Sequence, residues 1–434
     1  MINVLFLIED GSFVYDNRVR REAATLSEVG MGVTVICPKY LGERWHDVTG
    51  GIHVYRYMKP SLGSGFMAHV VEYLISLVSQ TVLAAWVALR HGFDVIHAAN
   101  PPDLLWVVAA PYRLLFGKRF VFDHHDLVPE LYEDRFGTPG SRVLTVLRFL
   151  ERMSFRFAHH VISTNESYRA VAMCRGDKRA DEVTVVRNGP ASGDFPDGEP
   201  DPMIRALGRI VVGYLGNMNP QDGVDRFIEM ARLLRQVHHR MDIGFVMIGK
   251  GDSFEDLVRL RDEFGLTDVI AMTGRIPWSD VIASLRATDI CVQPDPPGLL
   301  NDHSTMNKLM EYMSLGRAVV SYDLAETRVS GGDAVVYVQG SSAEDLASAV
   351  MALADNPDRM RELQRAGQER VRDVLSWEHQ SPRLVEVYEK LFPESALLGN
   401  RRHAACASAW PRVELQNSAT SASSGARRRS GAAV

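Results

Sequence analysis

Short apolar runs of strand length alternate with longer amphipathic stretches along most of the chain. Strands that alternate with helices are typical of doubly wound α/β domains with parallel sheets. Helices are predicted to begin near Asp16, Phe66, Pro102, Ser141 and Glu166. The predicted strands cover residues 4–8, 33–37, 94–97, 120–123, 160–163, 183–187, 210–215, 244–248, 269–273, 289–293 and 318–321.

A segment rich in Gly, Pro and Asp, residues 189–202, interrupts this alternation, and 434 residues are too many for one ordinary core. We predict an N-terminal Rossmann-like domain over residues 1–196 and a second over 203–377. Ligands of such sheets bind beside the carboxyl ends of the strands, so we expect the site in a central cleft between the domains. Residues 378–396 are predicted to be helical, and the Ala-, Ser- and Arg-rich residues 399–434 to be disordered.

Charge and cysteine content narrow the class of protein. A net charge of −6, without a basic stripe carrying interleaved aromatics, argues against nucleic acid as a partner. We expect no secretory signal, because a predicted strand begins at residue 4. Scattered cysteines without a C-x2-C pair indicate a reduced cytoplasmic protein with neither a disulfide framework nor a zinc site. These cysteines are Cys37, Cys174, Cys291 and Cys406.

One stretch, residues 66–89, is long and apolar enough to cross a membrane. Polar residues such as Glu72 and Gln80 are spread through it and would be costly in hydrocarbon. We therefore expect a buried or interfacial helix. A second apolar stretch, residues 104–118, ends in basic residues, which suits peripheral contact with a membrane face, although both stretches are equally suited to a domain core.

The most informative segment is residues 301–323, which has the pattern of a loop, a helix, a Gly stop and a buried strand. Ser304 and Thr305 are residues that often cap helix N-termini. Free N–H groups, the positive end of the helix dipole and Lys308 would together form an anion site. Glu311 is expected on the same side as His303, placed to accept hydrogen bonds from a sugar diol. This combination suits a nucleotide diphosphate.

The segment resembles the donor-binding helix of the family 4 retaining glycosyltransferases, whose signature is E-x7-E. Glu311 occupies the second Glu position, which holds the nucleotide ribose in that family, and His303 replaces the first. A subgroup with the pattern S-x3-K-L-x-E-Y-M is more similar, and its matching residues here are Ser304, Lys308, Glu311, Tyr312 and Met313.

The resemblance covers about residues 1–391 and implies the GT-B fold, in which two Rossmann-like domains face a central cleft. It implies that the helix after Ser376-Trp377-Glu378 crosses back to the first domain. It also implies that His125, in the sequence Asp123-His124-His125-Asp126, lies beside the donor sugar. The alternative is that one of these histidines caps a helix and the other is packed in the core.

Further family positions lie at the exits of predicted strands. The resemblance implies donor contacts from Gly11, Gly216, Asn217, Lys250 and Arg275, besides those of His303, Ser304, Thr305, Lys308 and Glu311. Asn217 and Asp222 stand where the family has a phosphate-binding Arg and Lys, so Lys308 and the helix N-terminus would have to compensate. On the acceptor side, the hypothesis names Asp16, Arg18, Asp103 and His124.

The predicted function is transfer of a sugar from a UDP- or GDP-linked donor to a hydroxyl acceptor, with retention and without a metal or cofactor. The expected catalytic residues are His125, Lys308 and Glu311. The acceptor is expected to be a bacterial cell-surface glycan, lipid-linked at the inner membrane face. The alternatives are a non-catalytic nucleotide-sugar-binding subunit and a GT-B sugar-nucleotide epimerase.

Overall fold

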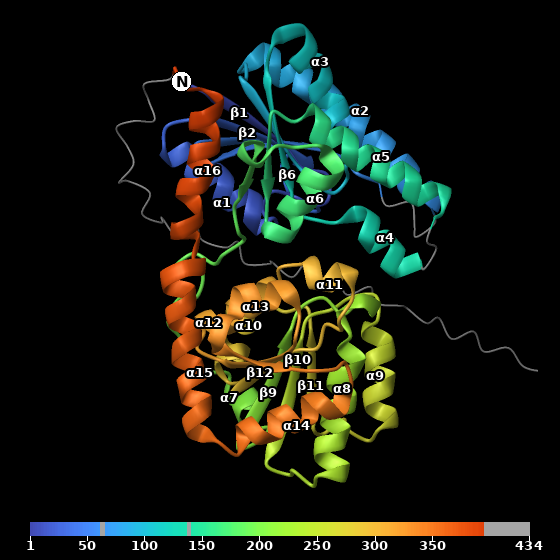
Figure 1. Cartoon of the computed structure of the whole chain (residues 1–434), viewed down its shortest axis with the longest axis vertical. Helices are drawn as coiled ribbons and strands as arrows, with labels where there is room; N and C mark the ends of the chain where they lie inside the picture. The colour runs from blue at the N-terminus through green and yellow to red at the C-terminus, as the bar shows by residue number, and fades with distance from the viewer. Residues whose placement is uncertain (61–65, 137–139, 395–434) are drawn as a thin grey trace, which may run out of the picture.

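A computed structural model describes residues 1–60, 66–136 and 140–394 and arranges them in two domains, one above the other in Figure 1. The upper, N-terminal domain is built on an eight-stranded sheet in the order β3-β4-β2-β1-β5-β6-β7-β8. All its pairs are parallel except β3 with β4. The strands are β1 (Asn3–Leu7), β2 (Gly32–Pro38), β3 (His46–Thr49), β4 (Ile52–Tyr57), β5 (Val95–Ala99), β6 (Arg119–His124), β7 (His160–Ser163) and β8 (Val183–Val185).

The sequence analysis missed the hairpin of β3 and β4. Its turn contains Gly50 and Gly51 with φ angles of 56° and 81°, which only glycine adopts readily, and a Gly-Gly pair between short strands is a recognised hairpin pattern. The helices of this domain are α1 (Asn17–Glu28), α2 (Phe66–Arg90), α3 (Trp106–Phe116), α4 (Val128–Phe136), α5 (Arg142–Phe157) and α6 (Glu166–Gly176).

Four of the predicted helix starts agree with the structure to within a residue. Asp16 and Ser141 cap α1 and α5, accepting hydrogen bonds from the backbone of Val19 (2.9 Å) and Leu144 (3.1 Å). The prediction that a helix begins near Pro102 was wrong, because α3 begins only at Trp106.

The C-terminal domain is built on a six-stranded parallel sheet in the order β11-β10-β9-β12-β13-β14. Its strands are β9 (Ile210–Leu215), β10 (Ile243–Ile248), β11 (Ile270–Gly274), β12 (Ile290–Gln293), β13 (Ala318–Tyr322) and β14 (Val335–Val338), the last of which was not predicted. Its helices are α7 (Pro202–Arg205), α8 (Val224–Arg232), α9 (Phe254–Glu263), α10 (Trp278–Arg286), α11 (Leu299–His303), α12 (Asn307–Ser314), α13 (Ala325–Gly331), α14 (Ala343–Ala354) and α15 (Pro357–Arg370).

The chain crosses between the domains twice, near residues 189 and 376, and the two crossings lie side by side. After the first domain it leaves through Gly189, where a Cβ atom would overlap the carbonyl oxygen of Leu375. The backbone N–H of Trp377 donates to the carbonyl of Pro190 (2.9 Å). Gly189 has no positive φ, so the glycine is required by this close approach.

The last described helix, α16 (Trp377–Leu391), lies against the first domain (Figure 1). Its residues Trp377, Leu384, Val387 and Tyr388 belong to the core beneath α1 and the first sheet. The indole Nε1–H of Trp377 donates to Thr25 Oγ1 of α1 (2.9 Å). Residues 395–434, which include Cys406 and the predicted disordered tail, lie outside the described residues.

Candidate active site

Lys308 lies in the first turn of α12 and is held by a carboxylate that the sequence analysis did not single out. Its Nζ is 2.9 Å from Oδ2 of Asp295, which follows β12 and is buried. Burial opposes the charge of Lys308, but Asp295 and Asp222 outweigh burial and raise its pKa. The ammonium also lies 5.0 Å from the ring centroid of Tyr214. Lys308 is therefore a fixed cation.

The backbone at the exit of β9 passes directly beside this cation. A Cβ placed at Gly216 would lie 3.7 Å from Nζ of Lys308. A Cβ at Gly249, which follows β10, would overlap the carbonyl oxygen of Gly216. Two strand exits and the start of α12 thus converge closely, as a backbone cradle for a phosphate requires.

The N-terminus of α12 differs from the prediction. The helix begins at Asn307 with Met306 as its N-cap, and no side chain caps it. Ser304 is instead the C-cap of α11, and its Oγ donates to the carbonyl of Leu300 (2.7 Å). The prediction that Ser304 or Thr305 caps the donor helix was wrong, and the first turn of α12 has no acidic residue either. An uncapped, positively polarised helix end is suited to an anion.

Residues 303–305 contact the other domain. Nδ2 of Asn165, the N-cap of α6, donates to the carbonyl of His303 (2.8 Å) and to Thr305 Oγ1 (3.0 Å). The hydroxyls of Tyr168 and Ser304 lie 3.2 Å apart. Because the extended segment after α11 breaks the helix, His303 and Glu311 do not lie two turns apart on one helix face as predicted. Glu311 is half-buried on α12, one turn after Lys308.

The remaining predicted donor residues of this domain lie nearer its surface. Asn217 is exposed, and its carbonyl accepts from the hydroxyl of Tyr214. Lys250 is exposed, with its Nζ 3.6 Å from Glu255 Oε1 and 5.1 Å from the ring of Phe254. Asp222 caps a turn by accepting from the backbone of Asn219 (2.9 Å).

Arg275, at the exit of β11, is close to the first domain. Burial, Asp10 and Glu43 raise the pKa of the Tyr40 hydroxyl, and the charge of Arg275 opposes this rise. A Cβ at Gly11 would in turn lie 4.0 Å from that hydroxyl. The charge of Arg275 therefore acts on Tyr40 across the domain boundary, and Gly11 lies beside the same hydroxyl.

His125 lies at the carboxyl end of β6, and its side chain is about 20% exposed. Its Nδ1 is 3.3 Å from Asp123 Oδ2, and its backbone N–H donates to Asn100 Oδ1 (2.8 Å). Burial disfavours the imidazolium, but the hydrogen bond and charge of Asp123 outweigh burial and raise the pKa of His125 to about 9. His125 is thus a cation at neutral pH, and its charge in turn lowers the pKa of Asp16, which burial raises.

Arg18, expected to contact the acceptor, is instead part of the support for His125. It is buried, and its Nε and Nη2 donate to the two oxygens of Asp123, both at 2.7 Å. Its Nη2 also lies 3.1 Å from Glu22 Oε1. Arg18 therefore fixes Asp123 and cannot reach the cleft.

A chain of buried polar contacts links Asp123 and Arg18 to the C-terminal helix α16. Burial and the charge of Asp123 raise the pKa of Glu22, and burial lowers the pKa of His97 to about 4. Glu22 Oε2 is 3.4 Å from His97 Nε2, and His97 Nδ1 is 2.7 Å from the hydroxyl of Tyr388. Glu22, His97 and Asp123 are close enough for one metal ion, but the guanidinium of Arg18 already pairs with both carboxylates.

Two further acceptor-side predictions were wrong. His124 points to the opposite face of β6 from His125, because side chains alternate along a strand. It is fully buried against Phe155 and Tyr168, and burial lowers its pKa to about 3. Asp103 is buried, accepts from Asn100 Nδ2 (3.0 Å), and burial raises its pKa. Both are interior residues of the first domain.

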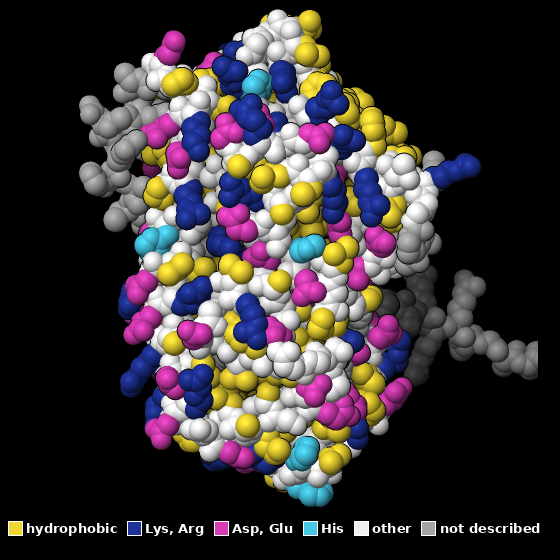
Figure 2. All heavy atoms as spheres, in the orientation of Figure 1, with side chains coloured by type: hydrophobic (Ala, Val, Ile, Leu, Met, Phe, Trp, Pro, Cys, Tyr) yellow, Lys and Arg dark blue, Asp and Glu magenta, His cyan; other side chains and the backbone are white. Residues whose placement is uncertain are grey.

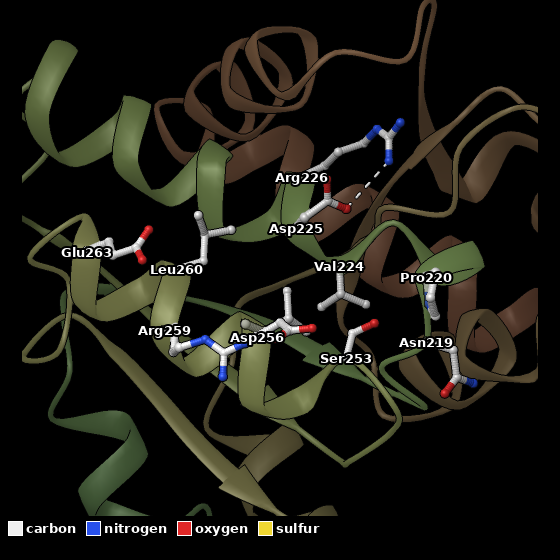
Figure 3. A pocket seen from close by; sticks show the side chains of 11 residues that line it. Asn219, Pro220, Val224, Asp225, Arg226, Ser253, Asp256, Arg259, Leu260 and Glu263 are labelled. Carbon is white, nitrogen blue, oxygen red and sulfur yellow. Dashed lines mark hydrogen bonds and ion pairs between the residues drawn. The ribbon is translucent and has the colours of Figure 1, made fainter. Parts of the chain in front are cut away.

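A separate cavity of about 510 Å³ lies between α8 and α9 on the second domain (Figure 3). None of the predicted site residues lines it. Its two arginines pair with lining carboxylates, Arg226 with Asp225 at 3.6 Å and Arg259 with Asp256. The chemistry described above is therefore not located in this cavity.

Two sheets facing each other across such a boundary define a protein of the GT-B fold. The comparisons agree. Residues 15–189 match the Glycosyl transferase 4-like domain, and residues 209–356 match Glycosyl transferases group 1. The matches support a family 4 glycosyltransferase.

Individual proteins also resemble this chain, one in sequence and two in structure. The α-maltose-1-phosphate synthase of Mycolicibacterium smegmatis is 26% identical over 308 residues, which cover 64% of this chain and 74% of that protein. A sucrose-phosphate synthase from Thermosynechococcus elongatus superimposes with a TM-score of 0.74 at 17% identity, covering 91% of this chain and all of that one. Anabaena Alr3699/HepE in complex with UDP-glucose gives 0.65 at 17% identity, covering 90% of this chain and all of its own.

Proposed function

We propose that this glycosyltransferase transfers a sugar from a nucleoside diphosphate to a hydroxyl acceptor with retention of anomeric configuration. The observation on which the proposal rests is the convergence of Lys308, the uncapped N-terminus of α12 and the backbone at Gly216. Cleavage of the donor leaves a diphosphate whose new charge needs fixed positive partners, and preorganised groups stabilise such charge without reorganisation. UDP or GDP is the proposed nucleotide; the complex of Anabaena Alr3699/HepE with UDP-glucose favours the former.

Each side of the boundary has a part in the proposed reaction. Lys308 and the helix N-terminus hold the diphosphate, and Glu311, one turn further along α12, accepts hydrogen bonds from the ribose. The imidazolium of His125 donates to the sugar from the opposite domain. Closure of the two domains excludes water, which would otherwise compete with the acceptor hydroxyl.

We further propose that the acceptor is a lipid-linked bacterial cell-surface glycan, glycosylated at the cytoplasmic face of the membrane. The apolar helix α2, which covers the acceptor-side loop after β1, supports this proposal. We propose that neither a metal nor a cofactor takes part. Among the described residues, Glu22, His97 and Asp123 are close enough to hold a metal ion, and Arg18 already pairs with both carboxylates.

The experiment is to incubate the pure protein with UDP- and GDP-sugars and measure release of nucleoside diphosphate and the fate of the sugar. A transferase releases the diphosphate, a binding subunit releases none, and an epimerase yields a new sugar nucleotide. Product anomeric configuration, determined by NMR, tests retention.

Chelation with EDTA should leave this release essentially unchanged, because Lys308 and the N-terminus of α12 supply the positive charge. The measurement is the rate before and after chelation. Loss of turnover on chelation and its return with Mg²⁺ or Mn²⁺ would refute the metal-independent mechanism.

A further inference from the structure

Helix α2 directs Ser76 and Gln80 towards the protein and a row of large apolar side chains outward. Ser76 Oγ donates to Glu9 Oε1 (2.9 Å), and Gln80 Nε2 donates to the carbonyl of Ile8 (3.2 Å) and to the hydroxyl of Tyr57 (3.1 Å). The outward side chains, between 37% and 88% exposed, are Val71, Leu74, Ile75, Val78, Val82, Trp86 and Leu89. Ala84 and Val87 of the same helix are buried in the core, so α2 presents apolar side chains on both sides, unlike an ordinary surface helix.

Two neighbouring helices extend the apolar surface. Helix α3 packs beside α2 and ends in exposed Leu114, Leu115 and Phe116, and α5 packs beside α3 with Val146 and Phe149 exposed. Figure 2 shows hydrophobic side chains gathered along the edge of the first domain where α2 and α3 lie, with basic side chains beside them. We call the outward side chains of α2, α3 and α5 the apolar face. Such a contiguous exposed surface is uncommon on a soluble monomer.

The charge of this surface is opposite to that of the whole chain. Four exposed arginines surround the apolar face and form no ion pair with any described residue: Arg90, Arg119, Arg142 and Arg156. The three helices contain only two acidic residues, Glu72 and Glu151, and both are buried. The chain as a whole has a net charge of −6. The positive charge is therefore concentrated around the apolar surface.

From this geometry we infer that the apolar face binds the surface of a bilayer that contains anionic lipid, with α2 lying in the interfacial plane. Acyl chains would cover the apolar side chains, and anionic headgroups would pair with the arginines. Residues 70–90 are long and apolar enough to span a bilayer, with a mean hydropathy of 1.6. However, Ser76 and Gln80 hydrogen-bond α2 to the residues that follow β1. Because the helix is thus held against the first domain, we infer that it lies on the membrane surface and does not cross the bilayer. A second copy of the chain is a poorer partner for the apolar face, because it would bring two cationic surfaces together.

This placement specifies how a lipid-linked acceptor would arrive, a step that rests on the proposed function. Glu9, beneath α2, pairs with Lys59 Nζ (2.9 Å), and Gly11 follows two residues later. The polar inner side of α2 therefore borders the acceptor side of the cleft. One helix diameter, about 10 Å, separates that side from the lipid, a distance that a lipid diphosphate headgroup can span.

The test is co-sedimentation of the full chain, without donor, with vesicles of phosphatidylcholine alone or mixed with phosphatidylglycerol. We expect binding only to the mixed vesicles, weakened by salt. Arg142→Gln with Arg156→Gln should reduce the partition coefficient about 30-fold, since each arginine near an anionic surface contributes about fivefold. Leu89→Ser with Leu115→Ser should reduce it at least tenfold. The matched control, Met203→Ser with Met241→Ser, changes exposed apolar residues of the second domain and should bind normally.

Trp86, 54% exposed on α2, offers an independent measurement. Its fluorescence should shift to the blue with mixed vesicles, and Trp86→Phe should abolish that shift. Equal binding to both vesicle types, unchanged binding of the paired variants, or a wild-type dimer that Leu89→Ser with Leu115→Ser converts to monomer would each overturn the inference. Diphosphate release is measured separately without vesicles, so membrane binding and transferase activity can fail independently.

Discussion

At the scale of single residues, Lys308 is the positive charge on which the proposed donor binding depends most. Its partner Asp295 is buried, so removal of the lysine alone would leave an unpaired carboxylate in the interior, a change that is strongly destabilising. Lys250, by contrast, is exposed and pairs with a surface carboxylate. The two lysines therefore allow a matched comparison.

Lys308→Met combined with Asp295→Asn should weaken binding of nucleoside diphosphate by about 10- to 150-fold, the equivalent of one lost hydrogen bond to a charged group. Binding of the uncharged nucleoside should be unchanged, because it presents no charge to the ammonium. Calorimetry with both ligands measures this. Lys250→Met is the control and should affect both ligands little; equal losses for both ligands in the double variant would contradict the assignment.

Glu311→Gln should weaken binding of the nucleoside as well as of the diphosphate, because the carboxylate is proposed to hold the ribose. The expected loss is again about 10- to 150-fold. Glu344→Gln, an exposed carboxylate on α14, is the matched control. A folded Glu311 variant with wild-type affinity would remove this residue from the site.

At the scale of secondary-structure elements, His125 depends on parts of four of them. Asp123 of β6 holds the imidazolium, Arg18 and Glu22 of α1 hold Asp123, and His97 of β5 joins this group to Tyr388 of α16. The sequence singled out His125, and it named Arg18 only as an acceptor contact. It could not show that Arg18 points inward, because the partner Asp123 is 105 residues away.

His125→Ala should lower turnover by about 10²- to 10⁴-fold, the range for a positioned catalytic group, with a much smaller change in nucleotide affinity. Turnover per folded molecule, nucleotide affinity and melting temperature are measured on the same variant. A lowered melting temperature with near-normal turnover would make His125 a structural residue only.

The raised pKa of His125 also predicts a pH dependence. Because the folded value of about 9 exceeds the ordinary 6.5, the stabilisation from its pairing with Asp123 is complete below pH 6.5 and is lost as pH rises through 9. The difference in melting temperature between the wild type and His125→Gln should therefore narrow between pH 6 and pH 10. A difference that stays constant over this range would contradict the ion pair.

The donor segment shows what local pattern can and cannot predict. Helix α12, its left-handed Gly316 and strand β13 follow from residues close together in sequence, and they were predicted. The extended segment at 304–306 is held by Asn165, some 140 residues away, so the capping residues were misassigned. Asp295 follows a predicted strand directly, and a carboxylate at that position was a pattern that could have been recognised.

At the scale of the whole molecule, the alternation of strands and helices predicted two doubly wound α/β domains, and the resemblance to family 4 glycosyltransferases implied the GT-B fold. The sequence also placed the interruption near residue 189, where the chain does leave the first domain. The contacts between the domains could not be predicted, because surface complementarity leaves no periodic pattern in the sequence. One such contact is the hydrogen bond from Ser167 Oγ to Glu326 Oε1 (2.7 Å).

Leu384→Ala should cost about 2–5 kcal/mol of unfolding free energy, because Leu384 of α16 is fully buried in the core of the first domain. The exposed Val374→Ala, ten residues earlier, is the control and should change stability little. Hydrogen exchange should locate the loss in α1 and β1. A loss confined to the second domain would contradict the packing of α16.

The position of α16 has a consequence for synthesis on the ribosome. The first domain to be translated lacks four core side chains until the second domain has been made, since Trp377, Leu384, Val387 and Tyr388 follow the entire second domain. At about 5–20 residues per second, the nascent first domain waits roughly 10–40 s with that part of its core open to solvent. Translation speed and chaperone access during this interval therefore determine how much of the protein reaches its native state.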